Sequence, residues 1–164
     1  MKCSCFIPIL FITHYFFAQS FDAQKYTYSV ILDEKSEDIK VYAHLDFKKL
    51  NKTASHLKLN LIQYSEKSTM GMKITEFQLN GMKTNNFEHY GDTISIPVAS
   101  SLEKFSVTIK YKGKPKDGFI ISTLPNQDKT YFSDHWPNRA RNWLASIDTP
   151  SDKVKVRFKV YVPK

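Results

Sequence analysis

The sequence predicts an all-β domain. Apolar and polar residues alternate with a period of two over most of the chain, which is the pattern of strands with one buried and one solvated face. Turn-forming residues separate these segments at intervals of roughly 8–15 residues, a spacing typical of a sandwich or an open, twisted sheet. The two cysteines are Cys3 and Cys5, so beyond them the fold must be held by core burial without disulfides.

The first half of the chain predicts a hairpin followed by a third strand. Residues 26–32 and residues 39–47 alternate between apolar and polar side chains, and the polar segment 34–37 is expected to connect them. Residues 57–61 repeat the pattern with leucine at every second position. In each segment one face is expected to enter the core.

Tight turns divide the next predicted strands. A strand over residues 73–79 ends at Asn80-Gly81, a dipeptide typical of a two-residue hairpin turn. Tyr90-Gly91-Asp92 precedes a short strand over 93–96, and a longer strand covers 105–111. Loops containing proline, over 112–118 and 124–129, follow that longer strand.

One segment interrupts the β pattern before the last strand. Residues 137–146 show no alternation, and Pro137 can start a short helical turn, so we expect one such turn there. The final alternation runs from Lys153 to Val162, with apolar residues on one face and basic residues on the other. We expect the apolar face of this strand to enter the core as well.

A secretory signal peptide is predicted over residues 1–20. Lys2 supplies a positive start, residues 3–17 are mostly apolar, and Ala18-Gln19-Ser20 places small residues before a cleavage site at Phe21. An uncleaved membrane anchor is the alternative, but the apolar run is shorter than the roughly 20 residues that span a bilayer. The sequence predicts a secreted or periplasmic mature domain over residues 21–164, with no stable membrane span after cleavage.

The chain carries a formal net charge of +8, with basic residues dispersed along it. Basic proteins can bind nucleic acid or anionic membranes, but base stacking requires aromatic residues interleaved with the positive charges. The last strand offers only Tyr161 on its basic face, so we expect solvated strand faces and no nucleic-acid partner. No metal site is expected, because the histidines beyond the signal peptide are not spaced as ligands: His44, His56, His89 and His135.

Aromatic and charged residues gather in the segment 131–143. The cluster comprises Asp134, His135, Trp136, Arg139, Arg141 and Trp143. It allows two interpretations. The cluster can be a substrate-facing loop, in which a carboxylate binds an amino group and an aromatic ring lines a side-chain pocket. It can also be a structural corner with packed tryptophan and with arginines paired to Asp148 or Asp152, which the residues alone favour.

The run Asp134-His135-Trp136-Pro137-Asn138-Arg139-Ala140-Arg141-Asn142-Trp143-Leu144, followed by Asp148-Thr149-Pro150-Ser151-Asp152-Lys153, resembles a segment of a known family. It is similar to the N-terminal β domain of M1 zinc aminopeptidases, most of all to bacterial secreted members. The resemblance implies a saddle-like antiparallel β sandwich that precedes a thermolysin-like zinc domain.

The resemblance also implies roles for individual residues. Asp134, His135 and Trp136 are the expected substrate-binding residues, although the family usually has Gln or Glu where Trp136 stands. The remaining matched positions are expected to form a structural motif that fixes the loop: Arg141, Asp148, Pro150 and Lys153.

A function follows from the resemblance. The domain would flank the active-site cleft of a zinc metallo-aminopeptidase and shape the pocket for the first substrate residue. The zinc-binding motif His-Glu-x-x-His does not occur in the sequence. We therefore expect a truncated domain, inactive alone, without catalytic residues or a cofactor of its own, because zinc belongs to the intact family enzyme. Its partners would be peptide substrates or a missing catalytic domain.

Two other classes of protein stay open. One is a stand-alone secreted β-sandwich module that binds peptides or a partner without enzymatic activity. The other is a non-functional remnant of a split gene, which would leave an unpaired sheet edge near residues 158–162.

Overall fold

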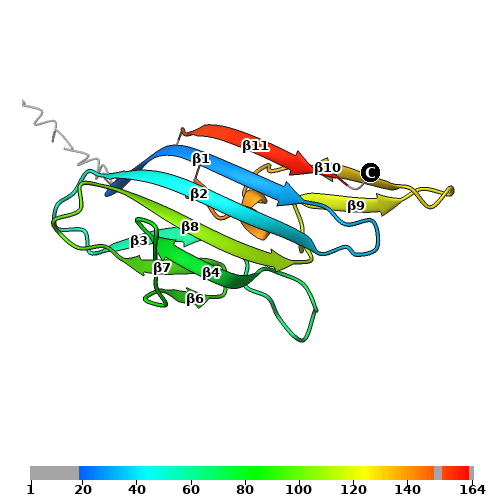
Figure 1. The fold of residues 1–164 in the computed structure, drawn as a ribbon, viewed down its shortest axis with the longest axis horizontal. Helices are drawn as coiled ribbons and strands as arrows, with labels where there is room; N and C mark the ends of the chain where they lie inside the picture. Colours follow the sequence, from blue (N-terminus) through cyan, green and yellow to red (C-terminus); the bar gives the residue numbers. More distant parts are fainter. Residues whose placement is uncertain (1–18, 150–152, 163–164) are drawn as a thin grey trace, which may run out of the picture.

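A computed structural model describes residues 19–149 and 153–162 (Figure 1). The predicted signal peptide falls almost entirely outside the described residues, as does Pro150 of the structural motif. The described strands are β1 (Phe21–Ile31), β2 (Ile39–Lys49), β3 (His56–Asn60), β4 (Lys73–Leu79), β5 (Met82–Lys83), β6 (Glu88–Tyr90), β7 (Thr93–Pro97), β8 (Lys104–Gly113), β9 (Phe119–Thr123), β10 (Lys129–Ser133) and β11 (Lys155–Tyr161). No helix within the described part of the chain is long and apolar enough to cross a membrane.

The largest sheet has six strands in the order β11-β1-β2-β8-β4-β5. Its neighbouring strands are antiparallel except for β11, which runs parallel to β1. The predicted alternation holds in β1, β2 and β8, whose inward side chains are buried; examples are Tyr28 in β1, Leu45 in β2 and Ile109 in β8. The prediction of an all-β fold is confirmed.

A three-stranded antiparallel sheet, β3-β7-β6, lies beneath the large sheet (Figure 1). Leucines of β3 and isoleucines of β7 face the large sheet and join its buried side chains in one hydrophobic cluster. These four residues, Leu57, Leu59, Ile94 and Ile96, are fully buried. Burial of a leucine-sized side chain contributes about 1.5–3 kcal/mol each, so this contact between the two layers is a principal source of stability.

The β9–β10 hairpin extends from one end of the large sheet (Figure 1). The chain then turns through one 3-10 turn, η1 (Ala140–Asn142), and crosses back under the large sheet. The prediction of a short helical turn within 137–146 is confirmed, although only three residues form it. Trp143, Leu144 and Ala145 follow directly and are buried in the core. We call these three residues the returning segment; they complete the second layer.

The last strand differs from its prediction. β11 lies at the edge of the large sheet, and all of its residues are exposed. Phe158 stacks on Tyr28 with ring centroids 5.3 Å apart, yet 45% of its surface remains accessible, and Val160 is 56% accessible. The expectation that the apolar face enters the core is therefore wrong. The physical reason is the position of the strand at the edge of the sheet, where Phe158 contacts the rings of Tyr28 and Trp143 but the flank away from β1 stays open to solvent.

Candidate functional site

Arg139 ties the start of the β9–β10 hairpin to its end. Its guanidinium makes a two-point contact with the carboxylate of Asp117, in which Nε donates over 2.8 Å to Oδ2, and Nη2 contacts Oδ1. Nη1 donates over 2.7 Å to Oδ2 of Asp134. The same guanidinium holds the pKa of Asp117 below its usual range. A planar arginine fork suits this geometry, since it supplies parallel donors in fixed directions.

Arg141 ties a second pair of segments together. Nε donates over 2.9 Å to Oδ2 of Asp148, and Nη1 donates over 2.7 Å to Oδ2 of Asp92. The backbone carbonyl of Arg141 accepts a bond of 2.7 Å from the amide of Ile62. Asp92 lies in the turn before β7, so this arginine joins the small sheet to the segment that follows η1.

Tyrosine hydroxyls from the large sheet hold the returning segment from above. The hydroxyl of Tyr111 donates to the carbonyl of Trp143 over 3.1 Å and accepts from the amide of Ala145 over 3.2 Å. The hydroxyl of Tyr28 donates to the carbonyl of Ala145 over 2.8 Å. Burial raises the pKa of both phenols. Backbone groups that would otherwise be buried without partners are thus satisfied, which fixes this irregular segment against the sheet.

Trp143 and His135 connect the buried segment to the surface loop. The Trp143 indole is 4% exposed and lies 4.6 Å from the ring of Phe119. Its Nε1–H donates to Nε2 of His135 over 3.2 Å. This bond requires Nε2 of His135 to be unprotonated. Burial likewise lowers the pKa of His135, against the opposing effect of Asp148 and Asp134. The imidazole therefore accepts this bond in its neutral form, although the residue as a whole remains exposed to solvent.

The tip of the loop faces solvent. Trp136 is 78% exposed, precedes a cis peptide bond to Pro137, and donates its backbone N–H to Oδ1 of Asp134 over 3.1 Å. On the neighbouring hairpin, Phe132 lies directly opposite Ile120, and both are exposed. We call the loop of residues 134–136, together with the arginines and the Trp143 ring that hold it, the corner. Its inner part is held by ion pairs and hydrogen bonds, and its outer part exposes an aromatic ring and a carboxylate.

Gly118 allows the two sides of this corner to approach. It adopts a φ of +73°, and a Cβ at this position would lie 2.3 Å from the carbonyl oxygen of Arg139. Its own carbonyl accepts the amide of Asp134 over 3.0 Å. Only glycine combines this backbone conformation with such close backbone contact.

The structure brings some of the sequence-predicted residues together and leaves others apart. Asp134, His135 and Trp136 share one loop; His135 accepts a hydrogen bond from the buried Trp143, whereas the Trp136 side chain makes no such contact with the described core and is 78% exposed. Arg141 and Asp148 form an ion pair. Lys153 is exposed and makes no ion pair with any described residue. The carboxylates of Asp92 and Asp117 were not expected from the sequence; the Asp117-Gly118 turn is a local signal for one of them, whereas nothing near Asp92 predicts its long-range contact.

The described residues do not offer a zinc site. Within residues 19–149 and 153–162, no group of three or more histidine, cysteine, aspartate or glutamate side chains is placed to hold a metal ion. The carboxylates of the corner are paired with arginine instead and are not gathered around a common point. The side chains of the described residues do not fit the zinc of the family that the sequence resembles.

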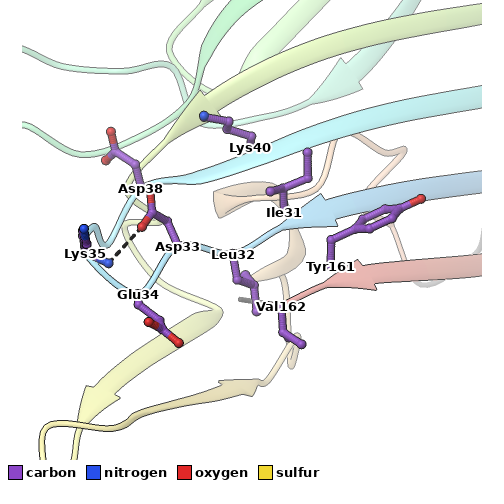
Figure 2. Close-up of a pocket in the computed structure, with 9 residues that line it drawn as sticks. All are labelled: Ile31, Leu32, Asp33, Glu34, Lys35, Asp38, Lys40, Tyr161 and Val162. Carbon is purple, nitrogen blue, oxygen red and sulfur yellow. Dashed lines mark hydrogen bonds between the residues drawn. The ribbon is translucent and has the colours of Figure 1, made fainter. Parts of the chain in front are cut away.

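A surface cavity of about 350 Å³ lies away from the corner loop, between the β1–β2 connection and the end of β11 (Figure 2). Its lining is of mixed charge, with Asp33, Glu34 and Asp38 beside Lys35 and Lys40. The Asp33 carboxylate accepts the backbone amide of Lys35, so part of this lining serves the turn. None of the predicted site residues lines this cavity.

The fold is shared with solved M1 enzymes. No protein-family model and no curated protein matches the sequence. Native yeast LTA4 hydrolase is 19% identical with a TM-score of 0.73, and the match covers 88% of this chain and 23% of the hydrolase. The M1 zinc metallopeptidase of Deinococcus radiodurans, solved with a Tyr-Ser-Ala substrate, is 18% identical with a TM-score of 0.67 over 88% of this chain and 33% of that one. This chain therefore has the fold of an M1 N-terminal β domain and spans a third or less of the length of these enzymes.

Proposed function

We propose that this protein serves as the N-terminal β domain of a secreted M1-type zinc aminopeptidase and that its corner loop lines the pocket for the first residue of a peptide. The main support for this proposal is the shared fold, together with the corner, in which an ion pair to Arg139 holds the loop while Asp134 and Trp136 stay accessible to solvent. The bound Tyr-Ser-Ala of the Deinococcus enzyme supports a peptide as the ligand class.

The chemistry of the loop suits the amino end of a peptide. Asp134 already accepts hydrogen bonds from Arg139 and from the backbone of Trp136, and its side chain remains 41% accessible. A carboxylate has lone pairs for further donors, so it can accept a substrate ammonium group. The exposed indole of Trp136 supplies an apolar wall and a cation–π surface beside it.

Catalysis is assigned to a separate zinc-bearing domain, in the same polypeptide or in another one. The role of the described domain is to bind and orient. Arg139 and Arg141 hold the loop by ion pairs to different segments, so the loop is positioned before the substrate arrives. Such preorganisation lowers the entropy cost of placing a peptide in a cleft.

Site-specific photocrosslinking tests the proposal. A photoreactive phenylalanine derivative replaces Trp136 in the full gene, expressed in its native host. The expected product joins position 136 to a polypeptide segment that carries, or directly neighbours, a His-Glu-x-x-His motif. The purified crosslinked species should come from a preparation that releases the first residue of Tyr-Ser-Ala.

Met82 provides the matched control position. It is 72% exposed, in β5 at the opposite edge of the large sheet from β11. A crosslink from position 82 to the same zinc-motif segment, or no such crosslink from position 136, would overturn the proposed placement of the corner loop. Conversion of Trp136 to Ala should reduce peptide turnover while the free chain melts unchanged, because the side chain is mostly exposed.

A stand-alone binding module is the second candidate. The observation in its favour is the exposed apolar pair of the hairpin, where Phe132 is 63% exposed and lies opposite Ile120. This candidate predicts that the purified chain binds Tyr-Ser-Ala by itself and that no zinc-motif segment is crosslinked. Saturable binding without any peptidase partner would favour it over the enzyme domain.

A further inference from the structure

The outer face of the large sheet gathers most of the basic residues of its strands. Strand register places them side by side on the surface turned away from the core. We call this surface the basic face; its basic side chains are Lys25, Lys40, Lys48, Lys73, Lys83, Lys104, Lys110, Lys112, Lys155, Arg157 and Lys159. Its carboxylates are only Asp22, Asp46 and Glu76, although the whole chain carries a formal charge of just +8.

Several lysines of the basic face lie directly opposite one another. Lys112 is the register partner of Lys40 on β2 and of Lys73 on β4, so three lysines follow one another across the sheet. Lys25 pairs with Lys155 in the same way. Like charges at directly opposite positions destabilise a sheet.

Among the described residues, none of Lys40, Lys73 and Lys112 forms an ion pair within 4.0 Å, although Lys40 lines the cavity at the β1–β2 connection together with Asp33 and Asp38. Lys110 differs, because Glu76 binds it over 2.9 Å. Its contact, together with that of Lys83, lowers the pKa of Glu76 to about 2. An uncompensated row within an otherwise consistent fold is the kind of local conflict that functional surfaces retain.

Apolar side chains lie within the same row. Lys40 is followed across β1 and β11 by Ile31 and Tyr161, which are 45% and 53% exposed (Figure 2). A shallow hollow of about 230 Å³ opens beside them, and Ile31, Tyr42, Lys40 and Lys112 contribute to its lining. Lysines that surround exposed isoleucine and tyrosine side chains suit the surface of a membrane. There, cations bind anionic headgroups, and tyrosine rings lie at the depth of the headgroups.

We propose that the basic face docks on bilayers rich in anionic phospholipids. Lipid phosphates can pair with the lysine row, and the outer face of the sheet presents enough basic side chains to contact several headgroups at once. Nucleic acid is a poorer fit, because base stacking needs a series of open aromatic rings, whereas this face offers the exposed Tyr161 and a Tyr42 ring that already has the Lys110 ammonium over it at 5.7 Å. The docking surface lies on the opposite side of the large sheet from the tyrosine hydroxyls that hold the corner, so it does not depend on the proposed peptidase role.

Vesicle co-sedimentation of the purified full chain tests the proposal. Vesicles of phosphatidylcholine with roughly 30 mol % phosphatidylglycerol should bind the chain, and pure phosphatidylcholine should not. The triple variant Lys40→Gln, Lys73→Gln, Lys112→Gln should lower the partition coefficient about 100-fold, since each lysine near an anionic surface is worth about 5-fold. Binding should weaken progressively as salt is raised.

A matched triple variant controls for net charge. Lys58→Gln, Lys67→Gln, Lys116→Gln removes the same number of exposed lysines from elsewhere on the chain. It should leave at least a tenth of the binding intact. The single variant Lys112→Gln, with an expected loss of about 5-fold, serves if the triple variant folds poorly.

Three outcomes would overturn the proposal: equal losses in the two triple variants, equal binding to vesicles with and without anionic lipid, or tighter binding to duplex DNA or heparin than to vesicles at equal anion concentration. A large loss confined to the basic-face variant, with a melting temperature that is not lowered, supports it.

Discussion

Replacing Tyr111 with Phe tests whether buried hydroxyls hold the corner in place. The Tyr111 hydroxyl is the shared partner of the carbonyl of Trp143 and the amide of Ala145, at 3.1 and 3.2 Å. Its removal leaves two buried backbone groups without a partner. A buried polar group without its hydrogen bond costs about 1–3 kcal/mol, so we expect a loss of roughly 2–4 kcal/mol in the free energy of unfolding.

Two further phenylalanine variants calibrate this value. Tyr28→Phe leaves only the carbonyl of Ala145 without a partner and should cost about 1–2 kcal/mol. Tyr42→Phe removes an exposed hydroxyl that makes no hydrogen bond with a described residue, and it should change stability by less than about 0.5 kcal/mol. All three variants remove one oxygen from a tyrosine of the large sheet, so they differ only in what the oxygen contacts.

Urea unfolding followed by tryptophan fluorescence measures these changes. Trp143 is buried and Trp136 is exposed, so unfolding changes the environment mainly of Trp143. The slope of free energy against urea should stay constant, because the buried area does not change. If Tyr111→Phe costs no more than Tyr42→Phe, or no more than Tyr28→Phe, the hydroxyls do not hold the segment and the argument fails.

Three further changes probe the corner and the basic face. Gly118→Ala should lose about 2–4 kcal/mol, because it combines a positive φ with a backbone clash, whereas Gly91→Ala, with open space at its Cβ, should lose only about 1 kcal/mol; chemical unfolding compares them. The pKa of His135 is lowered in the folded state, so its contribution is complete above pH 6.5 and is lost as pH falls through the lowered pKa; His135→Gln should flatten this part of the melting profile measured between about pH 7 and pH 5. Lys112→Gln should raise the melting temperature slightly at low salt, because it relieves two like-charge contacts, and the gain should disappear at roughly 0.5 M salt.

The strands could be predicted from sequence because burial alternates locally. In β1, β2 and β8 nearly every second residue contacts the core, so the pattern can be recognised from neighbouring residues in the sequence. The turn at Asn80-Gly81 could be predicted for the same reason, since both residues adopt positive φ angles that their side chains permit. The exposure of β11 could not, because an alternating strand has the same pattern at a sheet edge as at its centre.

The site could be predicted only in part. The loop of Asp134, His135 and Trp136 was marked by its unusual composition, and the pairing of Arg141 with Asp148 spans only seven residues. The contact between Arg141 and Asp92 spans 49 residues and depends on how two sheets are placed, which no local pattern encodes. The basic face was missed for the same reason, since dispersed lysines become a single surface only after six strands align in register.

Two arginines separated by one residue give the corner its rigidity. Arg139 reaches Asp117 and Asp134 at the base of the hairpin, whereas Arg141 reaches Asp92 and Asp148 on the other side of η1. A tight turn directs side chains two positions apart to different sides, so one short segment can join four others. Each exposed ion pair alone would contribute little stability. When one planar guanidinium group binds two carboxylates, both contacts share the entropy cost of ordering a single arginine side chain. A loop held in this way can present Trp136 in one position to a ligand, which a single arginine or a pair of lysines would not achieve.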